Sequence, residues 1–363
     1  MASLEQILYF RNLTGVIESI KAGIPCPLPD AMLKSHKQVS GNRAEYFKIT
    51  GTRQVARIVQ YGSPAQRQGL REVDSVPITL MHSFEDMAWP LSLMIALTQM
   101  SELKKDAKGT EQAEYQSRNF KKRFVNLRQV AAMQALFTGI LYWDKNGNLL
   151  PSSAGAAASV DFSVPAGNKT TVGGLITGWN TTSTDIIGQI EALQAKAVAA
   201  SGYPITTAYY ANGVASWIGA NTTALQYLKF NLEMGTQYVK NKSRIPQGFG
   251  GIANWIYAGD TFYADSTNTN RVIMPAATVV FTPDVDEEWW DIYEGSFLVP
   301  KTVTPQMNQS ASDMLSEANL AEVFGQFGYG QLSMNPPTVV QYAGDTFLPI
   351  LKVPGAIYQT TPT

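Results

Sequence analysis

The first regular hydrophobic pattern lies near the N-terminus. Apolar side chains recur at helical spacing over residues 3–21, which predicts an amphipathic helix with Ser3 as its N-cap. The positions that form this face are Ile7, Phe10, Ile17 and Ile20. Gly23 ends the pattern, and the segment IPCPLPDAM follows it. Three closely spaced prolines exclude a helix or a central strand, so this segment is expected to be an extended arm.

A long hairpin is predicted next, over residues 53–87. Its first limb is strand-like and basic, and the chain reverses through Gly62, Ser63 and Pro64. The second limb alternates apolar and polar positions at Val76, Ile78 and Leu80. A two-stranded hairpin is marginal in water and needs a further surface to pack on. The hairpin and the proline-rich arm are therefore expected to lie on neighbouring copies of the same chain.

Residues 88–139 read as helical, with a polar break near Gly109. The strongest part is RNFKKRFVNLRQVAAMQALFTG, which predicts a long straight helix that is basic in its first half. One apolar stripe consists of Phe120, Phe124, Leu127 and Ala131. Gly139 suits the first position after the helix, where a left-handed conformation ends it.

The remainder alternates short strands and helices. Asn146-Gly147 predicts a tight hairpin, and residues 184–201 a helix capped by Thr184 or Asp185 and ended by Gly202. The tail YAGDTFLPILKVPGA is expected to hold two apolar runs joined by a turn at Gly344. Further strands are expected at ITTAYYA and at residues 252–257, 271–281 and 289–299, with a helix pair around Trp217 and Leu232.

Composition and charge narrow the function classes. The chain has 363 residues, 45% of them hydrophobic, with a net charge of −1 and a pI near 6.2. A net charge this close to zero argues against a protein whose main function is to bind nucleic acid or an anionic membrane. The charge is polarised, because residues 1–130 hold 18 Lys and Arg against 12 Asp and Glu, and the remainder holds 10 against 17. Either chance or pairing between the halves of different copies would explain this.

Candidate chemistry is sparse. Cys26 is the single cysteine, so no internal disulfide is possible. Neither a signal peptide nor a membrane-spanning run is present in the sequence. The two histidines, His36 and His82, lie in an arm segment and a strand edge, where packing is more common than catalysis. The segment GNKTTVGG lacks the first glycine of a phosphate loop. We therefore expect no enzyme activity, no metal and no cofactor.

The acidic run DVDEEWWDIYEG at residues 284–295 leaves alternatives open. Its acids alternate as in a calcium loop, but Trp289 stands where that loop needs glycine. The run could instead belong to a carbohydrate-binding or hydrolytic domain, or be a solvated turn before a strand anchored by tryptophan.

A basic flank on the long helix is the second candidate site. Its members lie on one side of the predicted helix and could contact phosphate groups. A partner-facing or solvated flank is the competing interpretation, because no aromatic residues are interleaved with the charges. The residues are Arg118, Lys121, Lys122 and Arg128.

The order of these elements resembles the major capsid protein of tailed phages, in particular the lambda-type head protein of the E family, which has the Hong Kong phage capsid fold. The resemblance is carried by GSPAQRQG with VPITLMHSFED, by the helix end RQVAAMQALFTG, and by VDFSVP, GWNTTSTDIIGQIEAL and the tail. It implies an α+β fold with five regions. These are an N-terminal arm (1–48), an extended loop (49–87), a peripheral domain (88–165) with a spine helix at about 110–138, an axial domain (166–266), and a return to the peripheral domain (267–363).

The resemblance also implies a function. Members form hexamers and pentamers of an icosahedral shell around double-stranded DNA, in a virion assembled in the host cytoplasm. Partners would be copies of the chain, non-specifically bound DNA, a portal and a possible decoration protein, with no membrane. Scaffolding would come from a separate protein, since no coiled coil precedes the arm. Arm cleavage is not expected. An encapsulin-like nanocompartment shell is the alternative with the same fold.

Contacts between subunits can be predicted from charge. Arginines of the hairpin are expected to meet acidic residues of a neighbouring copy. The candidates are Arg53, Arg57, Arg67 and Arg71 on one side and Asp286, Glu287 and Glu288 on the other.

Overall fold

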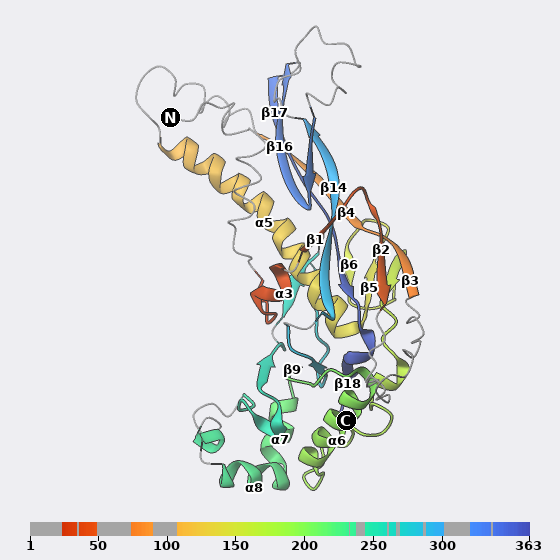
Figure 1. The fold of residues 1–363 in the computed structure, drawn as a ribbon. Helices are drawn as coiled ribbons and strands as arrows, with labels where there is room; N and C mark the ends of the chain where they lie inside the picture. Colours follow the sequence, from red (N-terminus) through yellow and green to blue (C-terminus); the bar gives the residue numbers. More distant parts are fainter. Residues whose placement is uncertain are drawn as a thin grey trace, which may run out of the picture.

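The computed structural model shows an elongated α+β chain (Figure 1). Helices α6, α7 and α8 lie at one end, and the long strands β14, β16 and β17 extend toward the other (Figure 1). Helix α5 (Ala107–Thr138) runs obliquely beside these strands. The structure describes residues 24–34, 36–48, 74–89, 107–231, 233–236, 244–259, 261–265, 269–285, 288–300, 320–334 and 337–363.

The main sheet has six strands and packs one face on α5. Strand β17 is central, running antiparallel to β4, β14 and β16, and β1 is a parallel edge strand on β14. Phe120 and Phe124 of α5 pack with Ala343 of β17, and Met87 of β4 packs against this cluster. The strands are β1 (His36–Val39), β4 (Met81–Ala88), β14 (Trp290–Pro300), β15 (Leu320–Phe324), β16 (Gln326–Met334) and β17 (Pro337–Leu351).

Helix α5 confirms the predicted spine helix. The stripe residues Phe120, Phe124 and Ala131 are buried. The helix ends where Gly139 adopts a φ of 71° and donates its N–H to the Ala135 carbonyl at 3.0 Å. The predicted break near Gly109 is wrong, because the helix passes through this residue. One glycine costs a helix only about 1 kcal/mol relative to alanine, which propagation of a long helix tolerates.

The second sheet has five strands, with β9 paired to β10 and β13, and belongs to the end that carries α6–α8. Asp185 caps α6 by accepting the Gly188 N–H at 3.0 Å, and Gly202 ends the helix in the left-handed region. The predicted helix at 184–201 is therefore confirmed. The elements are β8 (Lys169–Thr170), β9 (Thr207–Tyr210), β10 (Asn254–Tyr257), β13 (Val279–Thr282), β18 (Tyr358–Thr360), α6 (Ile186–Ser201), α7 (Val214–Ala220) and α8 (Thr222–Phe230).

Smaller elements surround these sheets. Asp144 holds the turn predicted at Asn146-Gly147 by accepting the N–H groups of Asn146 and Asn148 at 2.8 and 2.9 Å. In the described part of the arm, residues 24–29 are neither helix nor strand, as expected, but the short helix α3 (Asp30–Lys34) follows. The expectation that the segment IPCPLPDAM contains no helix is therefore wrong beyond its last proline. The remaining strands are β2 (Arg43–Lys48), β3 (Asp74–Thr79), β5 (Ile140–Trp143), β6 (Leu149–Leu150), β7 (Ala158–Asp161), β11 (Phe262–Ala264) and β12 (Asn270–Val272).

Strand pairing departs from the predicted regions in two places. Strand β4 was expected in the extended loop but pairs with β17 in the main sheet. Strands β13 and β18 were expected in the peripheral domain but belong to the sheet of β9. The predicted helix at 3–21 and most of the hairpin lie outside the described residues. The base of the hairpin is described, because β2 and β3 pair antiparallel from Arg43↔Thr79 to Lys48↔Asp74.

The turn predicted at Gly344 is wrong, because β17 runs through this residue as one continuous strand. Gly344 lies opposite Phe84 on one side and Phe327 on the other. A Cβ atom at this position would approach Phe327 Cε1 to 2.8 Å and the Ser83 carbonyl oxygen to 2.9 Å. The glycine therefore provides room for an aromatic ring over the strand.

We expect Gly344→Ala to destabilise the subunit by about 1–3 kcal/mol, the usual cost of overpacking a filled site. The urea unfolding midpoint of the purified chain measures this change. Gly167→Ala is the matched control, because a Cβ there has no atom within 4 Å. Equal midpoints for the two variants would contradict the close-packing argument.

Candidate functional site

The main sheet divides at one point, which we call the fork and define by Glu294, Gly295, Gly325, Asp345 and Thr346. Up to Glu294, β14 pairs with β17; from Ser296 onward it pairs with β15, while β17 pairs with β16 from Asp345. Gly325 is the apex between β15 and β16. Its N–H donates to the Gly295 carbonyl at 3.0 Å, and its carbonyl accepts from the Thr346 N–H at 3.3 Å. Two ribbons therefore leave the fork: β14–β15, and β16–β17, the second of which is flanked by β4 as far as Val340.

The side chain of Arg128, on α5, lies in the fork and forms ion pairs with two carboxylates. Its Nε and Nη2 atoms donate to the two carboxylate oxygens of Asp345 at 2.6 and 2.7 Å. Its Nη1 atom donates to Glu294 Oε1 at 2.6 Å. Gln326, the first residue of β16, donates to Asp345 at 3.2 Å. One guanidinium therefore joins the helix to both strands that diverge at the fork.

The cluster is withdrawn from solvent. The side chains of Arg128, Asp345 and Glu294 are 13%, 0% and 12% exposed. Burial acts to lower the pKa of Arg128, but the carboxylates of Asp345 and Glu294 outweigh it and raise that pKa above its ordinary value. His36 Nδ1 lies 3.4 Å from Glu294 Oε1, which brings the arm strand β1 to the same cluster.

Aromatic rings cover the sheet at the fork. Phe297 of β14 stacks on Phe327 of β16 with centroids 4.4 Å apart, which links the two ribbons one step beyond the fork. Phe84 of β4 is 43% exposed and lies within about 6 Å of several rings. Its neighbours are His82, Phe297, Phe327, Tyr329 and Tyr342. This surface offers ring stacking.

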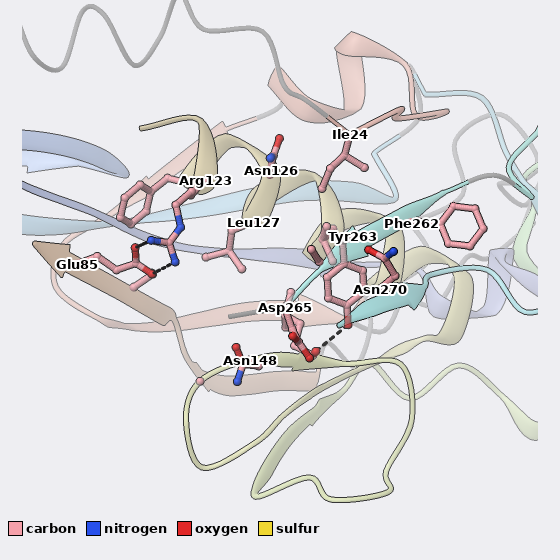
Figure 2. Close-up of a pocket in the computed structure, with 16 residues that line it drawn as sticks. Ile24, Glu85, Arg123, Asn126, Leu127, Asn148, Phe262, Tyr263, Asp265 and Asn270 are labelled. Carbon is pink, nitrogen blue, oxygen red and sulfur yellow. Dashed lines mark hydrogen bonds and ion pairs between the residues drawn. The ribbon is translucent and has the colours of Figure 1, made fainter. Parts of the chain in front are cut away.

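A groove of about 680 Å³ lies between α5, β4 and the β5–β6 and β11–β12 hairpins (Figure 2). The paired Glu85 and Arg123, 2.9 Å apart, lie at one end, and Phe262 and Asn270 at the other (Figure 2). Asp265 accepts from Arg271 Nε at 2.9 Å. Because an arginine engages each of these carboxylates, the groove gives no support to the hydrolytic alternative.

The structure separates the four residues of the predicted basic flank of α5 into two that reach solvent and two that do not. Arg118 is exposed and Lys122 is half-buried. Lys121 is fully buried, and Arg128 is engaged in the fork, so these two do not present their charges to solvent. The prediction of a DNA-facing surface is therefore reduced to Arg118 and Lys122, and the inclusion of the other two is corrected.

Burial lowers the pKa of Lys121 to about 7. The folded state then releases a proton that the unfolded chain keeps up to about pH 10.4. Stability should rise by about 1–2 kcal/mol between pH 7 and pH 8.5. In Lys121→Met this rise should be lost, whereas Lys122→Met should keep it. Urea midpoints across the pH range test this. The range stops at pH 8.5 because burial also raises the pKa of Cys26, to about 11, which has the opposite effect at higher pH.

The predicted inter-subunit residues lie mostly outside the described residues. This holds for Arg53, Arg57, Arg67 and Arg71, and for Asp286 and Glu287. Glu288 is described and exposed. Next to it, Trp289 and Trp290 are buried and donate their indole N–H groups to the carbonyls of Asp284 and Met32 at 2.6 and 2.9 Å. The strand is therefore anchored by tryptophan, as one interpretation of the acidic run predicted.

The remaining candidate groups have packing contacts. His82 Nδ1 lies 2.8 Å from Thr346 Oγ1, and its ring stacks on Phe297 at 5.3 Å. Among the described residues, no group of three or more His, Cys, Asp or Glu side chains is arranged to hold a metal ion. Within the same residues, no helix has the length and apolar character needed to cross a membrane.

Sequence reasoning missed the fork. A signal was present, because Glu294 and Asp345 each stand beside a glycine within mostly apolar segments, IYEGSF and YAGDTF. A charge inside a buried strand needs a partner of opposite charge. The partner itself could not be identified, because Arg128 is 217 positions from Asp345.

The fold is a long helix on a branched sheet, joined to a second α/β sheet, and its fork is held by ion pairs and stacked rings. The sequence model of the phage major capsid protein E family matches residues 10–289. The chain belongs to this family, so it is a phage capsid protein and forms a virion shell from many copies. The resemblance inferred from the sequence is confirmed.

Solved structures agree on the fold. A phage-related protein from Bordetella bronchiseptica RB50 superposes with a TM-score of 0.51 at 11% identity, over 97% of each chain. A putative capsid protein of a prophage of E. coli CFT073 gives 0.50 at 13% identity, over 80% of each chain. These two superpositions confirm the expected α+β capsid fold. No curated protein matches the chain by sequence. Nothing in these comparisons favours the encapsulin-like or carbohydrate-binding alternatives.

Proposed function

We propose that this capsid protein closes into hexamers and pentamers of an icosahedral shell around double-stranded DNA. The observation that carries the proposal is the sheet of β2 and β3. Among the described residues, these strands pair only with each other. The side chains of Ala44 and Tyr46, on β2, are buried in the main core and hold the base of this sheet to the body. Residues 49–73 lie between them in the sequence, and a hairpin of this kind cannot enclose its apolar side chains in a core of its own. These residues would complete their packing on a neighbouring copy, and this contact would make the assembled shell more stable than the separate subunits.

Charge would select the register of this contact. The hairpin arginines 53, 57, 67 and 71 meet Asp286, Glu287 and Glu288 of the next copy in our proposal. An exposed pair contributes only ~0.2–1 kcal/mol. Burial of the arm and the hairpin must therefore supply most of the association energy, over roughly 2,000 Å² or more of interface.

The inner surface would contact DNA through a few exposed cations. Arg118 and Lys122 are the members of the predicted flank that reach solvent. The near-zero net charge suits a container, because strong neutralisation of phosphates would bind the genome too tightly for release. A separate scaffolding protein, a portal and a decoration protein are the further partners in this proposal, with assembly in the host cytoplasm.

Electron microscopy of the purified full-length chain tests the proposal. We expect closed shells in which hexamers and pentamers can be counted, with sedimentation showing large particles in equilibrium with smaller rings. A chain that stays monomeric at every concentration, alone and with the other head proteins of its phage, would contradict it. Packaged DNA, as opposed to an enclosed enzyme, would separate a phage head from a nanocompartment.

A further inference from the structure

We propose that Arg128 is a positioning residue for shell assembly. It clamps the fork, and through Asp345 and Glu294 it sets the direction in which the two ribbons β14–β15 and β16–β17 project from α5. This inference rests on the proposed shell function, and the experiment below keeps the two separate.

The geometry of the fork supports a clamp. The carboxylates belong to the two strands that part there, Glu294 to β14 and Asp345 to β17, and one guanidinium binds both. A bidentate contact fixes orientation as well as distance, because the guanidinium is planar. Rotation of either ribbon away from α5 would break at least one of these short hydrogen bonds.

The apex glycine makes room for the guanidinium. Gly325 has a φ of 69°, in the left-handed region. A Cβ there would lie 2.6 Å from Arg128 Nη2 and 2.6 Å from Glu294 Oε1. The turn between β15 and β16 is therefore shaped around the charge cluster, and Gln326 continues the contact into β16.

Stability by itself is a weak reason to bury three charged groups. Buried ion triads can often be replaced by apolar residues of similar volume without loss of stability, since desolvation opposes their attraction. What apolar residues do not provide is a directional contact. The ribbons extend from the fork as the long blue strands of Figure 1, so a small rotation at the fork is a large displacement at their far ends.

His36 links the arm to the same point. The strand β1 that carries it is an edge strand whose residues are mostly exposed, so little apolar burial holds it. Its backbone ladder with β14 runs from His36↔Ile292 to Val39↔Gly295 and ends beside the fork. The position of Glu294, which Arg128 fixes, therefore also bears on the placement of β1 along β14.

Three variants of the full chain test the inference, each assembled under the conditions used for wild type. Arg128→Lys keeps the charge and loses the bidentate geometry. The triple variant Arg128→Met, Glu294→Met, Asp345→Leu removes the clamp with apolar replacements. Arg123→Met is the matched control, because this arginine lies on the same helix and forms an exposed ion pair with Glu85.

Three readouts, namely urea unfolding, electron microscopy and amide exchange, separate positioning from stability. Urea midpoints measure folding, and electron microscopy measures the fraction of shells with the wild-type diameter. In Arg128→Lys and the triple variant we expect that fraction to fall at least tenfold, with amide exchange at least tenfold faster over residues 296–300 and 326–334. The triple variant should show both changes although its urea unfolding midpoint stays near that of wild type. Arg123→Met should match wild type in every measurement.

Uniform shells from Arg128→Lys, or from a folded triple variant, would overturn the inference and leave a purely stabilising role. The same shell defect in Arg123→Met would overturn it too, because any charge lost from α5 would then suffice. If the triple variant does not fold, the fraction of wild-type shells formed by Arg128→Lys decides whether the inference holds. Failure of wild type itself to form shells would instead contradict the proposed function.

Discussion

Deletion of residues 57–73 is expected to abolish shell formation while leaving the subunit folded. The two strands at the base of the hairpin do not need the deleted segment, because Lys48 and Asp74 are already opposite each other in the β2–β3 ladder. Residues 49–56 remain as a connecting loop of ordinary length. Tyr46 and Ala44 stay buried in the main core. What is lost is the segment proposed to lie on the neighbouring copy.

Circular dichroism and urea unfolding of the deletion variant should match wild type, and electron microscopy should show no closed shells. The control is a full-length chain in which Arg57 and Arg67 are changed to Gln. This control should still form shells, with assembly less sensitive to salt, because the exposed ion pairs that salt screens contribute little and have been removed. Normal shells from the deletion variant would show that the hairpin is dispensable.

Asp345→Asn is expected to lower the free energy of unfolding by about 3–5 kcal/mol, the cost of breaking a buried ion pair by removal of one partner. The side chain is 0% exposed and accepts two hydrogen bonds from Arg128. The amide has nearly the same shape but presents an N–H₂ group to the guanidinium, so one contact becomes donor against donor. Arg128 then keeps its charge in a buried site with Glu294 as the remaining acid.

The matched control is Glu85→Gln, which removes the acid from an exposed pair between β4 and the same helix. The side chains of Arg123 and Glu85 are 57% and 37% exposed, so its loss should cost only ~0.2–1 kcal/mol. Urea unfolding of both variants at pH 7 measures the difference. Similar midpoints would mean that solvent reaches the fork and that the cluster is not effectively buried.

Local signals explain what could be predicted from the sequence. The spine helix, its end at Gly139 and the turn at Asn146-Gly147 each depend on residues within a few positions of one another. Helix α6 is of the same kind, with Asp185 and Gly202 at its ends. The order of these elements also supported the family resemblance, which the family match then confirmed.

Pairing between distant strands explains what could not be predicted. A glycine within an apolar run indicates a turn when read locally, and Gly344 was interpreted in that way. Its role as a space for Phe327 appears only once β16 lies beside β17. In the same way, nothing in the local sequences of β13 and β18 indicates which of the two sheets these strands join.

The sequence by itself determined the long helix, its end at Gly139 and the turn at Asn146-Gly147, because periodicity and capping act over short distances. The α+β fold and the role as a shell subunit were implied by the resemblance in the order of the elements. Only the tertiary structure decided that Lys121 is buried and that Arg128 binds Asp345 and Glu294 in the fork. The reason is physical: whether a charged side chain faces solvent or a buried partner depends on residues far away in the chain, which folding alone brings together.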